Sequence, residues 1–211
     1  MARVIAIAGA SGSGKSTLAE GLVRAIGPET ALVLPLDAYY HDLSHLQPAD
    51  REKVDFDHPN ALDLVLFQEH LLALKSGCSV SRPAYDFVTH CRLEEPIRVS
   101  PKMWIVVEGI HVASDRVLRS LFDTLVFVEA DSSLRWHRRL ARDQAERGRS
   151  AASVARFWEQ AERTFQSLGV VARQHADCVV RGEATIDESV SAICGQVAGL
   201  EAVARRKLTR A

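Results

Sequence analysis

The chain has 211 residues, a length that suits one domain with a substantial hydrophobic core. Hydrophobic residues make up 47% and charged residues 25%, which is typical of a globular protein and excludes a disordered one. The formal net charge of −1 excludes a whole-molecule positive field for nucleic acid or membrane. The four cysteines form no CxxC pair, and no apolar run approaches the roughly 20 residues that span a bilayer. We therefore expect a cytoplasmic protein with reduced thiols and no nucleic-acid or membrane partner.

Short apolar runs alternate with segments of helical length along the whole chain. The runs that read as strands buried on both faces are residues 4–8, 31–36, 103–107, 124–129 and 177–181. The expected helices are residues 15–26, 61–75, 115–122, 134–147, 152–174 and 187–206. Residues 80–99 mix prolines, aromatics and charges without a helical period, which indicates a β-type insertion. The alternation predicts one α/β domain over residues 1–211, with a parallel sheet and helices on both faces.

A phosphate-binding motif follows the first predicted strand. Residues 9–16 read GASGSGKS, which fits GxxxxGK[ST] between a strand and a helix and so predicts a P-loop NTPase fold. Glycines there let backbone N–H groups turn toward phosphate oxygens at a helix N-terminus. Lys15 would reach the β- and γ-phosphates of ATP or GTP, and the Ser16 hydroxyl would ligate Mg²⁺. The predicted nucleotide-binding residues are Gly9, Ala10, Ser11, Gly12, Ser13, Gly14, Lys15, Ser16 and Thr17.

Two absent motifs narrow the class of P-loop protein. Asn60 is the only asparagine and Ala61 follows it, so the NKxD motif of GTPase switches is missing. The chain also has no Gly-Gly pair, which transporter-type ATPases carry in their signature. The sequence therefore favours a kinase that acts on a small molecule.

Two carboxylates end predicted strands, where ligands of open α/β sheets bind. Asp37 closes the run 31–36, and Glu108 closes the run 103–107. A carboxylate at such a position can accept the proton of an attacking hydroxyl or hold Mg²⁺ through water, and we expect Glu108 to organise Mg²⁺ together with Ser16. The alternative for each is a carboxylate that merely caps the strand end.

Six arginines crowd one segment, and four of them share a helix face: Arg135, Arg138, Arg139 and Arg142, followed by Arg147 and Arg149. We predict a mobile lid over residues 134–150 that closes on the phosphates, with Gly148 as its hinge and Arg142 and Arg147 in catalysis. An RNA-binding stripe and a solvated charged face remain the alternatives.

Several short segments resemble those of one kinase family. They are DAYY (37–40), FDHP (56–59), PAYDF (83–87), EGI (108–110), RD (142–143) and ERGR (146–149). Together with the P-loop, they make the chain similar to the uridine kinase (uridine–cytidine kinase) family. The resemblance implies that the γ-phosphate of ATP or GTP moves to the 5′-hydroxyl of uridine or cytidine in pyrimidine salvage. Members of that family often form homo-oligomers.

The resemblance also implies roles for individual residues. Asp37 matches the catalytic base, and Asp57 matches the carboxylate that accepts the ribose 2′- and 3′-hydroxyls. Arg142 and Arg147 match the arginines nearest the triphosphate. The remaining substrate-binding residues would be Tyr85 and His90 on the pyrimidine edge, Phe87 stacked on the base, and the lid arginines Arg139 and Arg149.

The chain departs from the family pattern at three places: His111, Arg156 in place of a glutamine, and the residues after Gly182. Two rival functions therefore stay open. One is a phosphoribulokinase-like kinase for another metabolite alcohol. The other is a non-kinase, nucleotide-dependent protein that binds RNA.

Overall fold

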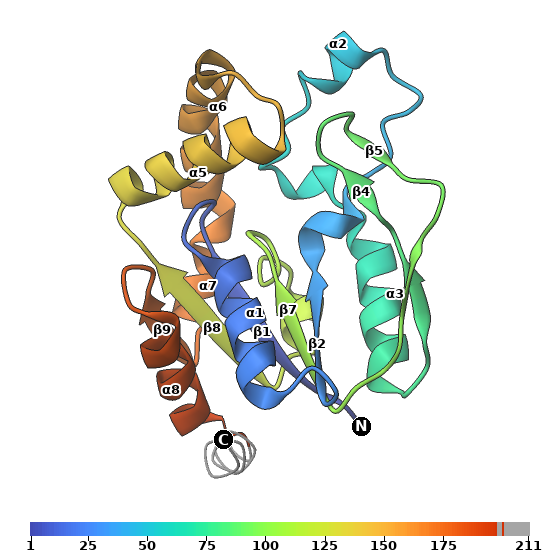
Figure 1. Ribbon diagram of the computed structural model, residues 1–211, viewed down its shortest axis with the longest axis vertical. Helices are drawn as coiled ribbons and strands as arrows, with labels where there is room; N and C mark the ends of the chain where they lie inside the picture. Colours follow the sequence, from blue (N-terminus) through green and yellow to red (C-terminus); the bar gives the residue numbers. More distant parts are fainter. Residues whose placement is uncertain (198–199, 201–211) are drawn as a thin grey trace.

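A five-stranded parallel sheet forms the centre of the protein (Figure 1). The computed structural model describes residues 1–197 and 200. The sheet order is β2-β7-β1-β8-β9, and every neighbouring pair runs parallel. Its strands are β1 (Arg3–Gly9), β2 (Ala31–Pro35), β7 (Trp104–Glu108), β8 (Thr124–Glu129) and β9 (Cys178–Arg181). The predicted parallel sheet is confirmed, and each strand begins and ends within one residue of its predicted bounds.

Helices bury both faces of this sheet. Val4 and Ala6 of β1 pack into a core with α3 (Leu64–Lys75), α4 (Arg116–Arg119) and α7 (Val171–Gln174). Ile5 and Ile7 point to the other face and pack with α1 (Lys15–Ile26) and α8 (Ile186–Gln196). Because successive residues of a strand face opposite sides, two apolar cores require an unbroken apolar run. This explains why the strands lack polar alternation.

Three helices lie beyond the carboxyl ends of the strands, at the top of Figure 1. They are α2 (Pro48–Arg51), α5 (Ser132–Glu146) and α6 (Ala151–Thr164). A π-helical turn, Phe165–Gly169, interrupts the single helix expected over residues 152–174 and leads into α7. The Phe165 ring stacks on Phe127 of β8 at 6.4 Å, and it occupies the space that a Cβ on Gly169 would need. The interruption therefore aims Phe165 into the core.

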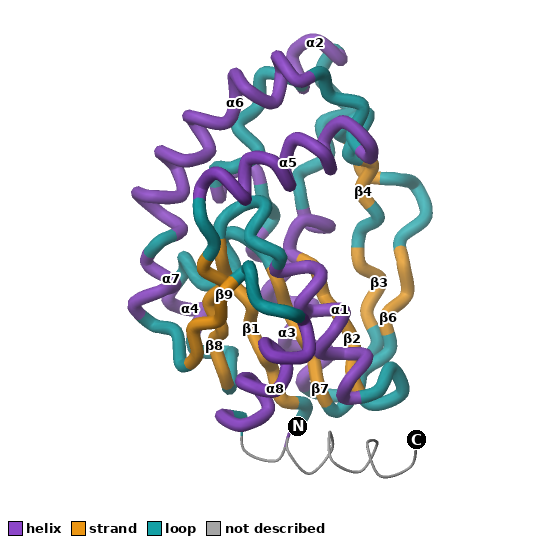
Figure 2. The backbone as a smooth tube through the Cα atoms, turned by 60° about the vertical axis from the view of Figure 1, so that its left-hand side comes forward, coloured by secondary structure: helices purple, strands orange, loops and turns teal. Residues whose placement is uncertain are grey.

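The insertion over residues 80–99 consists of two antiparallel pairs, as its β-type pattern predicts. Strand β3 (Val80–Arg82) pairs with β6 (Ile97–Val99), and β4 (Tyr85–Asp86) pairs with β5 (Cys91–Arg92). Figure 2 shows the insertion along one side of the molecule, and β3 contacts α3. Its far end therefore reaches the level of the strands' carboxyl ends.

Two helices, α3 and α4, have other bounds than expected because local capping decides where they begin. The helix expected from residue 61 begins at Leu64, since Asp63 accepts a hydrogen bond from the Leu66 amide and residues Pro59–Ala61 form a 3₁₀ turn. The helix expected over 115–122 spans only α4, which Asp115 caps. The predicted helix 187–206 is described as α8, and its part beyond Val197, apart from Leu200, lies outside the described residues.

The four cysteines differ in their exposure to solvent. Cys178 and Cys194 are buried, Cys91 is half-buried and Cys78 is exposed. None of the helices described in residues 1–197 and 200 combines the length and apolar character that a bilayer crossing demands.

Candidate active site

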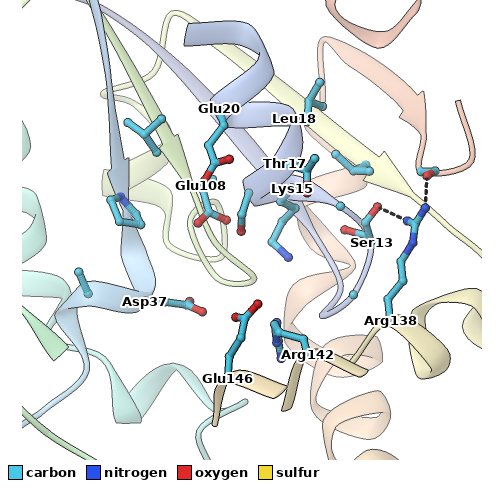
Figure 3. A pocket seen from close by; sticks show the side chains of 18 of the residues that line it. Ser13, Lys15, Thr17, Leu18, Glu20, Asp37, Glu108, Arg138, Arg142 and Glu146 are labelled. Atoms are coloured by element: carbon cyan, nitrogen blue, oxygen red, sulfur yellow. Dashed lines mark hydrogen bonds between the residues drawn. The ribbon is translucent and has the colours of Figure 1, made fainter. Parts of the chain in front are cut away.

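A cavity of about 1220 Å³ opens at the carboxyl ends of the parallel strands (Figure 3). Four parts of the chain line it: the P-loop, the ends of β2 and β7, helix α5, and the insertion. The loop between β9 and α8 closes a further side. This is the position at which open α/β sheets bind ligands.

The P-loop has the backbone that phosphate binding requires. Gly12 and Gly14 have φ values of +77° and +101°, which L side chains rarely adopt, and a Cβ on Gly12 would lie 2.4 Å from the Arg135 carbonyl oxygen. Lys15 opens α1, is 7% exposed, and donates to the Ala10 carbonyl at 2.9 Å. Burial lowers the pKa of Lys15, against the opposing effect of nearby carboxylates. Figure 3 shows its ammonium pointing into the cavity.

Asp37 and Glu108 both face this cavity (Figure 3). Asp37 follows β2 in a 3₁₀ turn, is 30% exposed, and lies 4.0 Å from the Arg147 Nη2. Glu108 ends β7 and is 5% exposed; burial first, then the charge of Asp37, raise the pKa of Glu108 to about 7. Lys15 and a hydrogen bond with the Ser16 side chain oppose that rise. These oxygen groups are the ligand type that Mg²⁺ prefers, so the site fits the predicted ion.

Helix α5 directs its arginines to different places. Arg142 and Arg147 line the cavity, and the Arg147 guanidinium lies 4.5 Å from the centre of the Phe87 ring. Arg135 instead forms a bidentate ion pair with Glu162 of α6, at 2.6 and 2.7 Å. Arg138, to which the sequence assigned no separate role, donates to the Ser13 and Gly182 carbonyls at 3.4 and 3.0 Å. It therefore joins the P-loop to the loop after β9 (Figure 3).

Asp57 lies outside the cavity lining and pairs with a buried arginine. Arg139 is 3% exposed and donates from Nη1 and Nη2 to the two Asp57 carboxylate oxygens, at 2.9 and 2.8 Å. The His111 Nε2 contacts the Asp57 carbonyl oxygen at 2.5 Å, so this departure from the family pattern supports the Asp57 backbone. Each carboxylate oxygen keeps a second acceptor site. Asp57 can therefore still accept from a diol.

Arg156 occupies the position where the family resemblance expects a glutamine, and Gln160 lies one helical turn further along α6. Arg156 is exposed on α6 and does not line the cavity. Gln160 donates from its amide nitrogen to the Asp55 carboxylate at 2.9 Å, two residues before Asp57. Local spacing alone did not identify it.

The insertion over residues 80–99 supplies aromatic side chains to one wall of the cavity. Tyr85 and Phe87 line the cavity with ring centres 5.3 Å apart, and the buried Tyr85 hydroxyl has no hydrogen-bond partner within the described chain. His90 is 8% exposed and stacks on Phe56 at 4.4 Å, outside the lining. Arg149 also lies outside the lining, with its guanidinium 5.9 Å from the Phe56 ring centre. The structure thus brings Tyr85 and Phe87 to the cavity, and sets His90 and Arg149 beside it.

The sequence analysis assigned no role to two acidic residues of the cavity or to one buried aspartate, although Glu146 and Asp143 lie in the ERGR and RD segments. Glu20 of α1 and Glu146 of α5 both line the cavity (Figure 3). Asp143 is an acidic residue of the arginine-rich helix α5; it is 0% exposed and contacts four arginines. Only the folded distances identify it.

The lowered pKa of His90 is expected to reduce the stability of the fold at acid pH. Burial, then the charges of Arg149 and Arg147, lower the pKa of His90 from 6.5 to about 4. In this pH window the unfolded chain binds a proton that the folded chain excludes, so stability falls as the pH falls from about 6.5 to 4. We expect His90→Asn to remove on the order of 1–3 kcal/mol of that loss, because asparagine does not bind a proton in this pH range. Asparagine is the replacement of choice because it tolerates the φ of +58° at this position.

Urea titrations at pH 7 and pH 4.5 measure this effect. His41→Asn, at an exposed histidine, is the matched control and should leave the acid loss unchanged. An equal acid loss in His90→Asn and in the wild type would contradict the assignment.

Comparison with known proteins decides the family. The profile of the Phosphoribulokinase / Uridine kinase family matches residues 4–188. The chain belongs to this family. A uridine kinase of Clostridium perfringens (strain 13 / Type A) is 43% identical over 150 residues, 71% of this chain and 72% of that protein. A uridine kinase of Salmonella enteritidis PT4 is 41% identical over 182 residues, 84% of this chain and 85% of that protein.

A solved structure of a kinase with a different description has a similar fold. The putative fructose transport system kinase from Silicibacter sp. TM1040 has a TM-score of 0.67 and 25% identity, and the match covers 85% of this chain and 89% of that one. The fold alone therefore does not decide the acceptor, which depends on the residues that surround it.

Proposed function

We propose that this protein transfers the γ-phosphate of ATP or GTP to the 5′-hydroxyl of uridine or cytidine, giving UMP or CMP. One observation carries the proposal: Asp37 faces Lys15 across a cavity whose acceptor end is walled by Tyr85 and Phe87. Relatives named uridine kinase at 41–43% identity support the same acceptor.

The donor side follows from the geometry of the P-loop and its neighbours. P-loop amides and Lys15 hold the β- and γ-phosphates at the N-terminus of α1. The Ser16 hydroxyl and Glu108 are the residues that would hold Mg²⁺, which neutralises phosphate charge when it is bound. Because Glu108 is buried beside Lys15, its ionised form also offsets the ammonium charge before the donor enters.

The transfer step is a direct in-line displacement. The 5′-oxygen forms a bond to the γ-phosphorus while the bond from phosphorus to the bridging oxygen breaks, and the nucleoside diphosphate leaves. Asp37 orients the hydroxyl and accepts its proton. Arg142 and Arg147 lie along the cavity from α5, where their guanidinium groups stabilise charge on the transferring phosphoryl group.

The acceptor side uses buried groups that need a partner. The Tyr85 hydroxyl has no hydrogen-bond partner within the described chain, so a base edge that satisfies it is favoured over one that does not. Phe87 offers a ring for stacking, His90 borders the insertion, and Asp57 accepts from the ribose diol. Arg139 and Arg149 complete this side of the site.

A panel of acceptors tests the proposal directly. ADP release, coupled to a spectroscopic assay, is measured with uridine, cytidine, adenosine, ribulose 5-phosphate, fructose and glycerate. We expect uridine or cytidine to give the highest kcat/KM. A preference for a sugar or sugar phosphate would favour the rival metabolite kinase, and hydrolysis that RNA stimulates without any acceptor would favour the RNA-binding rival.

Two further properties belong to the proposal. A kinase that uses nucleoside triphosphates fits the cytoplasm, where these donors are made, and we propose that location. Homo-oligomer formation stays a prediction from the family resemblance.

A further inference from the structure

One buried carboxylate holds the arginines of the site together. Asp143 of α5 is 0% exposed, and its Oδ1 accepts from Nε and Nη2 of Arg142 at 2.9 and 2.7 Å. The Arg147 Nε lies 3.6 Å from the same oxygen. Oδ2 lies 3.7 Å from the Arg139 Nε and 3.5 Å from the Arg149 Nη1. Among the described residues, Asp143 is the carboxylate that forms ion pairs with all four.

The backbone of Asp143 fixes two of these arginines as well. Its carbonyl oxygen accepts from the amides of Arg147 and Arg149, at 3.3 and 3.0 Å. Gly148 between them has a φ of +63°, and nothing lies within 4 Å of the place its Cβ would take. The left-handed turn therefore folds the chain back onto Asp143 as α5 ends. This gives Gly148 a static role, whereas its predicted role as a hinge stays untested.

Each of the four arginines leads from Asp143 to a different part of the site. Arg139 pairs with Asp57, and Arg147 lies 4.0 Å from Asp37. Arg142 lines the cavity beside the P-loop, and Arg149 lies against Phe56. One carboxylate is thus in contact with the side chains that border the donor, the acceptor hydroxyl and the ribose.

Charge explains why such a carboxylate is needed. Four guanidinium groups around one point repel each other, and a triphosphate can offset that repulsion only while it is bound. Burial alone would raise the pKa of Asp143, but Arg142, Arg147 and Arg139 lower it, so the carboxylate is ionised at neutral pH. Its negative charge is therefore present before any donor arrives.

We propose that Asp143 is a positioning residue whose carboxylate stands in for the absent phosphate and holds the four arginines at the spacing that transfer requires. The expected loss of kcat rests on the proposed function, whereas the expected change in polyphosphate binding rests on the ion pairs alone. Asp143 touches neither substrate, and it acts through the arginines.

The test compares Asp143→Asn with Glu162→Gln. Asparagine keeps the shape of the side chain and removes its charge. Glu162→Gln removes the charge of the α6 residue that pairs with Arg135. Arg135 lies on α5, the helix that also carries Asp143, but this ion pair lies outside the cavity lining. We expect Asp143→Asn to lower kcat at least about 10-fold without raising the KM for ATP, and Glu162→Gln to leave both near the wild-type values.

A second measurement separates positioning from simple loss of stability. Tripolyphosphate without acceptor should raise the Tm of Asp143→Asn by more than it raises that of the wild type or of Glu162→Gln, because the anion supplies the missing charge. Equal increments in all three proteins, or equal kcat losses in the two variants, would overturn the proposal. The increment needs no nucleoside, so a wrong acceptor would not affect it.

Asp143→Glu provides a further variant if the asparagine protein does not fold. It keeps the charge and moves the carboxylate by one methylene. We expect its tripolyphosphate increment to match that of the wild type while its kcat falls. An unchanged kcat would show that the placement of the carboxylate is irrelevant and would overturn the proposal.

Discussion

Replacing Asp37 by asparagine is expected to lower kcat by about 10²–10⁴-fold while the affinity for the nucleotide with Mg²⁺ persists. The asparagine side chain keeps the shape of Asp37 at the end of β2 but cannot take the proton of the attacking hydroxyl. The Arg147 contact at 4.0 Å weakens at the same time, which adds to the loss. The P-loop, which carries nucleotide affinity, is untouched.

Turnover from coupled ADP release and nucleotide affinity from titration calorimetry measure the two halves of this prediction. Asp50→Asn is the matched control, because Asp50 forms an exposed ion pair with Lys53 at 2.7 Å and does not line the cavity. Asp37→Asn with turnover within a few-fold of the wild type would remove Asp37 from the mechanism.

Asp57→Ala is expected to reduce the free energy of unfolding by about 3–5 kcal/mol, because it leaves the guanidinium of Arg139 buried without its bidentate partner. Arg139 is 3% exposed, so water does not replace the lost carboxylate. The double variant Asp57→Ala/Arg139→Met should recover part of the loss, since the unpaired charge is then gone. Urea unfolding of the three proteins measures both effects, and equal stabilities of the single and double variants would contradict the account.

Asp57→Asn, a milder change, tests the role of this residue in substrate choice. If the carboxylate accepts from both ribose hydroxyls, the ratio of kcat/KM for uridine to that for 2′-deoxyuridine should fall by about 10-fold or more. Asp63→Asn is the control, because Asp63 pairs with Arg92 at 3.2 Å outside the cavity lining. An unchanged ratio in Asp57→Asn would reject the proposed diol contact.

The central sheet was predictable because its chemistry is local. Strands buried on both faces are apolar along their length, and residues 4–8, 31–36 and 125–128 meet this condition. The P-loop was equally predictable, because its glycines and Lys15 are required by backbone shape and charge. These features are set by neighbours in sequence.

The helix errors arose where packing or capping, rather than helical periodicity, decides the backbone. The π-helical turn at Phe165–Gly169 depends on Phe127 of another strand, which no helical period reveals. The start of α3 depends on Asp63, whose side chain accepts a hydrogen bond from the Leu66 amide and so caps the helix. Propensity is a weak guide in both cases, since packing and capping override it.

The sequence identified individual residues of the candidate site more easily than the partners that those residues contact in the fold. Sequence indicated that Arg135 and Arg138 share a face with Arg142, but it could not tell that Arg135 turns to Glu162 and Arg138 to the P-loop. Nor could it distinguish Asp143 from a solvated acid, because the distinction is its complete burial. Such roles depend on tertiary distances.

Transfer of a labelled γ-phosphate tests the central claim most directly. ATP labelled at the γ-phosphate is mixed with uridine, Mg²⁺ and a molar excess of the protein, and the products of a single turnover are separated. We expect the label on the 5′-oxygen of UMP, in step with the ADP formed. Label found only in inorganic phosphate, or no label leaving ATP when either uridine or cytidine is present, would contradict the account.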